Sequence, residues 1–116
     1  MVEIFEVKEG RIIVAFCNEN LSVGILVLHP NQQLPRHNRP VKEELVQIHG
    51  KSVIKLFDND KLIKEISIEE GKNLEISAMQ YHVHSNPTDD KSITLWKFKG
   101  NIIRRSRILA GLRTRS

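Results

Sequence analysis

Short apolar runs separated by polar turns follow one another along most of this chain. The turns contain glycine, proline or asparagine and recur about every 8 to 12 residues, which is the spacing of all-β proteins. No stretch before residue 101 keeps a sustained helical period. We therefore expect strands over residues 2–7, 11–16, 22–29, 45–48, 52–57, 62–68, 74–76, 81–84 and 92–98.

Three of these segments carry additional information. Residues 2–7 and 11–16 flank Glu9-Gly10, which predicts a hairpin at the start of the chain. Residues 22–29 are continuously apolar, which predicts a strand buried on both faces.

Length and composition indicate one domain in a reducing environment. A chain of 116 residues can bury one core without disulfides, and Cys17 has no second cysteine to pair with. No leader of a charged segment followed by an apolar one opens the chain, and no apolar run approaches the roughly 18 residues that span a membrane. We expect a cytoplasmic protein that does not associate with membranes.

The positive charge is concentrated at the C-terminal end. Residues 97–116 hold seven of the 18 lysines and arginines and no acidic residue, so the rest of the chain has 11 basic against 14 acidic residues. A basic tail can contact phosphates, but no aromatic residue follows Phe98 to stack on bases. We therefore do not expect nucleic-acid binding, and favour a frayed or partner-packed terminus.

Candidate chemistry lies in two histidine-bearing segments, 37–43 and 81–86, each beside a turn. Side chains at positions i and i+2 of a strand share a face, so His37 is grouped with Arg39 and His82 with His84. Histidine and carboxylate are metal ligands as well as acids and bases. The expected pocket residues are His37, Arg39, Glu43, Gln47, His82 and His84.

The spacing of the two segments resembles the two motifs of the cupin superfamily. The first runs Asn31-x5-His37-x-Arg39-x3-Glu43-x6-Gly50, and the second Gly71-x5-Ser77-x-Met79-x2-His82-x3-Asn86. Six positions match the family: His37, Glu43, Gly50, Gly71, His82 and Asn86. The resemblance implies an all-β fold, the double-stranded β-helix or jelly-roll barrel. It places a single cupin domain at residues 1–100, with motifs at about 31–50 and 71–86, and a basic tail at 101–116.

The resemblance also implies a metal site with one departure from the family pattern. Metal-binding cupins use two histidines and a glutamate from the first motif and one histidine from the second. Here that set carries over to His37, Glu43 and His82, while Arg39 stands in place of the second histidine. His84 is the candidate substitute ligand. The implied cofactor is one divalent ion of iron, manganese, nickel or zinc, and otherwise none.

Arg39 leaves three functional hypotheses open, because a guanidinium cannot coordinate a metal ion and repels one. If Arg39 pairs with Glu43, the barrel binds a small polar or anionic molecule such as a sugar derivative or carboxylate. The alternative is a metal-dependent dioxygenase or isomerase using His37, Glu43 and His82. A further alternative is a non-catalytic protein that recruits an acidic partner through its basic tail. The sequence identifies no catalytic residue.

Association of two copies is also expected. Small cupins commonly pair through their N-terminal strands, and residues 2–16 contain enough apolar side chains for that role. Edge strands favour such pairing. We expect a homodimer whose interface includes these strands.

Overall fold

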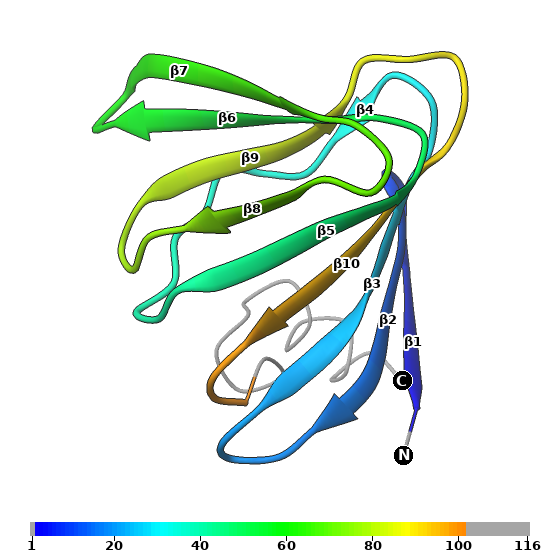
Figure 1. The fold of residues 1–116 in the computed structure, drawn as a ribbon, viewed down its shortest axis with the longest axis vertical. Helices are drawn as coiled ribbons and strands as arrows, with labels where there is room; N and C mark the ends of the chain where they lie inside the picture. The colour runs from blue at the N-terminus through cyan, green and yellow to red at the C-terminus, as the bar shows by residue number, and fades with distance from the viewer. Residues whose placement is uncertain (1, 102–116) are drawn as a thin grey trace.

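A computed structural model describes residues 2–101, which form ten strands in two antiparallel sheets (Figure 1). Along most strands of the larger sheet, buried residues alternate with more exposed ones, which is the pattern that buries one face of a sheet. The bounds of the ten strands are β1 Glu3–Val7, β2 Gly10–Cys17, β3 Ser22–Leu28, β4 Gln32–Gln33, β5 Glu43–His49, β6 Ser52–Asp58, β7 Lys61–Ile68, β8 Asn73–Ile76, β9 Tyr81–Asn86 and β10 Ser92–Phe98.

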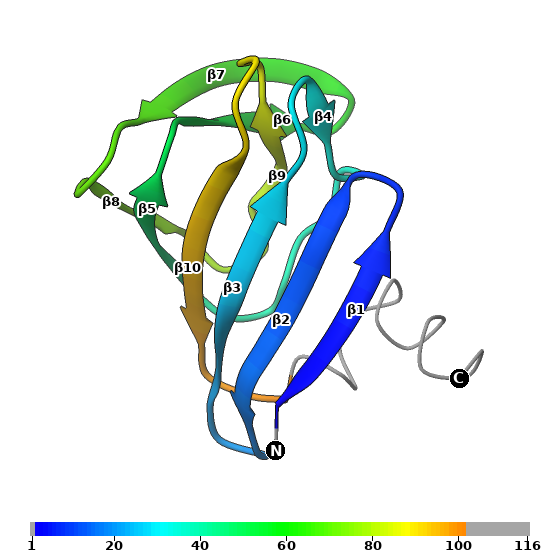
Figure 2. The ribbon, with the colours of Figure 1, turned by 90° about the vertical axis from the view of Figure 1, so that its right-hand side faces the viewer.

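The two sheets face each other and enclose one interior. The first sheet has the order β1-β2-β3-β10-β5-β8, and the second has the order β4-β9-β6-β7 (Figures 1 and 2). The second histidine segment lies on β9, in the second sheet, while Glu43 opens β5 in the first. Side chains from both sheets therefore meet inside the barrel.

The core is apolar and spans both sheets. Trp96 on β10 lies directly opposite Gly24 on β3, and a Cβ atom at Gly24 would fall 2.2 Å from the indole ring. Glycine is therefore required there by close approach. The buried apolar residues are Phe5, Ile12, Val14, Leu26, Leu28, Leu34, Leu45, Ile54, Ile68, Ile76, Val83, Trp96 and Phe98.

The structure confirms the predicted all-β class and the predicted hairpin, in which β1 pairs with β2. It corrects the prediction for residues 22–29. One face of β3 is buried, but its other side chains, Val23, Ile25 and Val27, are only half-buried on the outside of the sheet. The short strand β4 was not predicted, because two glutamines carry no apolar period.

The segment between β4 and β5 is tied to β9 by backbone hydrogen bonds. Leu34 N donates to the His84 carbonyl, and His37 and His82 exchange both of their backbone bonds, at 3.0 and 2.8 Å. Met79 N, in a residue with φ of 67°, donates to the Arg39 carbonyl at 2.6 Å. This pairing brings the first histidine segment alongside the second.

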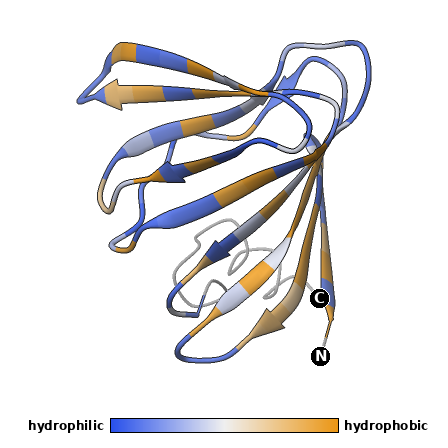
Figure 3. Ribbon diagram, in the orientation of Figure 1, coloured by the Kyte–Doolittle hydropathy of each residue, from blue (hydrophilic) through white to orange (hydrophobic). Residues whose placement is uncertain are grey.

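The outer face of the six-stranded sheet carries an apolar row that crosses five strands. Directly paired positions run from β1 to β5 through β2, β3 and β10, as Figure 2 shows for the strands. β2 and β3 are largely apolar along their length (Figure 3). We call this set the outer row: Ile4, Ile13, Ile25, Leu95 and Val46.

The basic tail lies almost wholly outside the described residues, since only Asn101 of it is described. Its Oδ1 accepts a hydrogen bond from the Cys17 thiol at 3.2 Å. Across residues 2–101, no helix has the length and apolar character needed to cross a membrane.

Candidate metal centre

Four potential metal ligands converge inside the barrel. His37 comes from the segment before β5, Glu43 from the start of β5, and His82 and His84 from the inner face of β9. One nitrogen or carboxylate oxygen from each lies within 4.8 Å of all the others. Metal–nitrogen bonds of 2.0–2.1 Å place ligand atoms about 3 to 4 Å apart around one ion. The four side chains can therefore hold one metal ion after small adjustments.

The side chains of the cluster lie close to one another. The ring centroids of His37 and His82 are 4.3 Å apart, those of His82 and His84 5.0 Å, and those of His37 and His84 5.5 Å. Glu43 Oε2 is 3.3 Å from His82 Nε2, and Glu43 Oε1 is 3.2 Å from His84 Nε2. The expected proximity of His37 and His82 inside the barrel is confirmed.

Backbone carbonyls set the proton positions on two of the rings. His37 Nδ1 is 3.1 Å from the Pro35 carbonyl, and His82 Nδ1 is 2.9 Å from the Gln80 carbonyl. A carbonyl only accepts, so each Nδ1 carries the proton and donates it. In the neutral ring the lone pair is then on Nε2, and both Nε2 atoms are buried with no hydrogen-bond partner among residues 2–101. Metal-binding histidines are oriented in this way by their second nitrogen.

His82 Nε2 and Glu43 Oε2 are consequently two acceptors facing each other across 3.3 Å, outside hydrogen-bond geometry. A cation between them, either a second ring proton or a metal ion, relieves the repulsion. A metal ion would satisfy Nε2 of His37 as well, which a single proton on His82 would not. The buried orphaned acceptors therefore fit a metal ion.

Burial and the neighbouring groups determine the charges. Glu43, His82 and His84 are 3%, 1% and 4% exposed. Burial, together with repulsion from His82, His84 and Arg39, lowers the pKa of His37 to about 3, against the attraction of Glu43. Burial also lowers the pKa of His84, opposed by the Glu43 carboxylate. His37 and His84 are therefore neutral at pH 7, as ligands must be.

Glu43 is the anion of the site. Burial on its own would raise the pKa of Glu43, but the contact with His84 Nε2 and the charge of Arg39 outweigh burial and hold that pKa well below its usual value. The adjacent Glu44 points outward, where Lys97 Nζ lies 3.3 Å from it. The strand period thus separates two consecutive glutamates into an inner and an outer one.

Arg39 stays beside the cluster and does not extend into solvent. Its Nε is 3.4 Å from Glu43 Oε2, its guanidinium carbon lies 4.9 Å from the centre of the Phe98 ring, and its side chain is 13% exposed. An ion pair and a cation–π contact hold the guanidinium in place. Arg39 and Glu43 thus form the ion pair that the sequence analysis considered as one alternative.

Gln47 is not brought into this cluster. It faces inward like Glu43, but four residues further along β5, which is about 13 Å at 3.3 Å per residue. Its amide nitrogen donates to the Ser92 hydroxyl and the His49 carbonyl, and its oxygen accepts from Thr94. Gln47 belongs to a separate buried polar network with Ser52, Ser92 and Thr94.

Two further residues of the second histidine segment, Asn86 and Tyr81, lie outside the cluster. Asn86 donates to the carbonyls of Leu28, His29 and Asp90 and accepts from Thr88, so it organises the turn after β9. Tyr81 is exposed, on the opposite face of β9 from His82, as its neighbouring position predicts.

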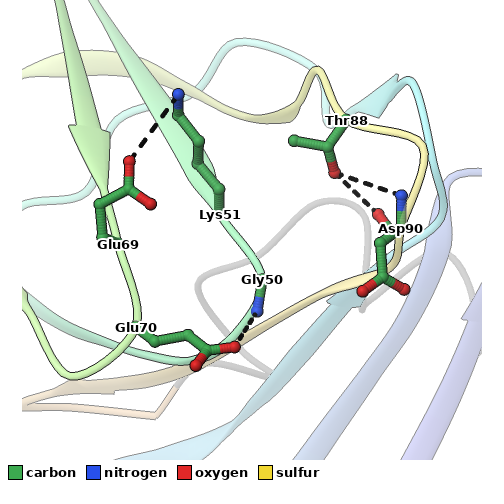
Figure 4. Close-up of a pocket in the computed structure, with 6 residues that line it drawn as sticks. All are labelled: Gly50, Lys51, Glu69, Glu70, Thr88 and Asp90. Carbon is green, nitrogen blue, oxygen red and sulfur yellow. Dashed lines mark hydrogen bonds and ion pairs between the residues drawn. The ribbon is translucent and has the colours of Figure 1, made fainter.

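An open depression of about 450 Å³ is lined by Gly50, Lys51, Glu69, Glu70, Thr88 and Asp90 (Figure 4). Gly50 and Thr88 follow the last residues of β5 and β9, so the depression lies away from the histidine cluster. Its lining is mostly charged, and its groups pair with one another: Lys51 with Glu69, and the Gly50 backbone amide with Glu70. His49 beside it pairs with Glu70 and Asp90. We place no chemistry in this depression, because its charges are already matched.

Two features of the site were beyond sequence reasoning. The carbonyls of Pro35 and Gln80 set the ring tautomers, and the Phe98 ring holds Arg39. The carbonyls lie two residues before the histidine they contact, but nothing in the residue types signals the contact. Phe98 is the inward residue at the end of β10 that pairs with Glu43 on β5, so strand register would have been needed to find it.

The sequence matches no family model and no sequence of a curated protein. Solved structures do resemble it. Oxalate decarboxylase from Lactobacillus farciminis superposes with a TM-score of 0.73 at 19% identity, over 87% of this chain and 32% of the enzyme. An uncharacterised Klebsiella pneumoniae protein with a double-stranded β-helix domain gives 0.70 at 16% identity, over 83% and 81%. Vicilin from hazelnut, Corylus avellana, gives 0.71 at 18%, over 85% and 31%.

These likenesses establish the fold and not the activity, since all three identities are below 20%. The chain has the double-stranded β-helix fold of the cupin superfamily, as the motif resemblance predicts. It spans about a third of the length of the decarboxylase and vicilin chains.

Proposed function

With the cupin fold as the premise, we propose that this protein binds one divalent transition-metal ion through His37, Glu43, His82 and His84 and presents it to a small oxygen-donor molecule. The observation that carries the proposal is the set of buried acceptors without donors: Nε2 of His37 and of His82, beside the Glu43 carboxylate. Buried acceptors are normally paired, and a metal ion pairs all of them at once.

The ligand set indicates the class of ion. Three neutral imidazole nitrogens and one carboxylate oxygen suit iron, manganese, nickel or zinc. The bound ion would supply a Lewis acid that polarises a coordinated oxygen. The protein's own residues do the rest: carbonyl-bonded rings hold His37 and His82 in the ligating tautomer, Glu43 neutralises one charge, and burial keeps bulk water away.

His84 takes the place of the ligand that Arg39 cannot provide. Two ligands thus come from one strand, at positions i and i+2 of β9. The Arg39 charge still opposes the ion, since two unit charges about 4 Å apart repel by about 4 kcal/mol at an effective dielectric near 20. We therefore expect binding weaker than that of a cupin with an imidazole at position 39.

The ligand set favours a metal-dependent enzyme over a metal-free binding barrel. Similar folds include an oxalate decarboxylase and a vicilin, so the fold alone does not decide between catalysis and binding. The polar or anionic small molecule expected from the sequence is assigned to the same site, beside the ion. An oxygen donor is the natural ligand for an open position on such an ion.

Titration of metal-free, untagged protein with Co²⁺ tests the proposal. We expect one equivalent to bind, with a visible absorption band of an ion ligated by nitrogen and oxygen, and we expect Fe²⁺, Mn²⁺, Ni²⁺ or Zn²⁺ to compete for the same site. A protein that shows neither a band nor one-to-one uptake with any of these ions would contradict it.

The assignment of His84 gives a sharper prediction. His84→Gln should weaken Co²⁺ binding by at least about 100-fold, because even the outer-shell partners of a metal ligand are worth 10- to 100-fold. His49→Gln is the control, since His49 pairs with Glu70 and Asp90 outside the cluster. If His84→Gln binds as tightly as the unaltered protein, only His37, Glu43 and His82 are ligands.

A further inference from the structure

The charge of the proposed centre is not balanced by the described residues. Glu43 contributes one negative charge and Arg39 one positive charge, while a histidine that binds a metal ion does so as a neutral ring. A divalent ion therefore brings the cluster to a net charge of +2. Net charge in a buried site is costly unless it is paired. An anion is the ligand that such a site lacks.

Arg39 has hydrogen-bond donors to offer that anion. A guanidinium carries five N–H groups in a planar fork. Among residues 2–101, its side chain makes one hydrogen bond, from Nε to Glu43 at 3.4 Å, and one contact with the face of the Phe98 ring. That hydrogen bond is longer than the 2.7–2.9 Å of a strong charge-assisted one. The two terminal amino groups make no hydrogen bond to any described residue.

Arg39 also lies on the accessible side of the cluster. Glu43, His82 and His84 are buried, whereas His37 is partly exposed and the Arg39 side chain is 13% exposed. A small ligand that reaches the centre from solvent therefore meets these two side chains first. Phe98 beneath the guanidinium keeps its plane fixed, which favours recognition of a planar ligand with two oxygens.

We propose that Arg39 selects a small carboxylate as the ligand of this centre, one carboxylate oxygen meeting the ion and the guanidinium pairing with the negative charge. This inference rests on the proposed metal function and names its ligand class. A neutral sugar derivative would leave the charge of +2 uncompensated. Arg39 is thus a specificity residue, standing where the family pattern has a metal ligand.

Malonate and its neutral diamide, malonamide, are the probes, added to Co²⁺-loaded protein and followed by calorimetry and by the Co²⁺ absorption band. We expect malonate to bind and to shift the band, and malonamide to bind at least tenfold more weakly. Arg39→Gln should weaken malonate binding by about 10- to 100-fold, the range of a hydrogen bond to a charged group. Arg39→Lys keeps the positive charge but loses the planar fork of N–H donors. Its malonate affinity should therefore fall between that of the unaltered protein and that of Arg39→Gln.

Arg36→Gln is the matched control, because Arg36 pairs with Asp60 and covers Phe57 away from the cluster. It removes the same charge and should leave malonate binding within about twofold. Unchanged malonate affinity in Arg39→Gln, or equal binding of malonamide, would overturn the inference while the metal proposal stands. Absence of Co²⁺ uptake before any malonate is added would overturn the metal proposal, and this inference with it.

Discussion

Glu43→Gln should abolish metal binding and destabilise the protein at the same time. The amide is a poorer ligand than the carboxylate, and the substitution removes the only anion among the four ligands while the Arg39 charge remains. We expect Co²⁺ affinity to fall by more than about 100-fold. Removing one partner of a buried ion pair costs about 3 to 5 kcal/mol, and the low end applies because Arg39 is partly exposed.

The neighbouring glutamate provides the control for both effects. Glu44→Gln makes the same chemical change one residue away, on the outer face, where it removes only the surface pair with Lys97. Such a pair is worth at most about 1 kcal/mol. Metal titration and chemical denaturation of the metal-free proteins measure the two effects separately. A Glu43→Gln protein that still binds one equivalent tightly would remove Glu43 from the ligand set.

Ile54→Ala should produce the largest loss of stability of any single apolar truncation considered for this chain. Ile54 is 0% exposed at the centre of the second sheet, and it pairs with His84 on β9 and Ile66 on β7. Truncating a fully buried isoleucine removes its burial and leaves a cavity, at a cost of about 2 to 5 kcal/mol.

The same substitution at an exposed isoleucine is the comparison. Ile63→Ala on β7 should change the free energy of unfolding by less than about 0.5 kcal/mol. Denaturant unfolding of metal-free protein measures both. Equal losses for the two variants would mean that the interior near His84 closes on the cavity, and that packing does not hold this ligand in place.

The arrangement of strands was largely predictable, because it depends on local signals. Apolar runs and turn residues predict nine of the ten described strands, and the error at β3 has a physical cause. A continuous apolar run fits either a strand buried twice or a strand with an apolar outer face. The structure shows the second, which is why the outer row exists.

The site was predictable in part. The motif spacing grouped His37, Glu43 and His82, and the two-residue period added His84. Gln47 was also grouped with them, but its side chain contacts Ser92 and Thr94 instead. The two-residue period gives the face on which a side chain lies and not its position along the strand. The position of Arg39 depends on Phe98, a residue remote in sequence, so no local pattern reveals whether the guanidinium turns inward.

The four candidate ligands are divided between two segments of the chain. This division affects how proteins with such a site are recognised from their sequences. The first segment contributes one histidine and one glutamate, and the second contributes two histidines on one strand. A search pattern that demands two histidines before the glutamate passes over such a chain, although four candidate ligands converge in its fold. The pattern His-x5-Glu followed by His-x-His on a later strand describes it. Relatives that share this pattern should vary at position 39 according to the charge of their ligand, while both histidines of the second segment persist.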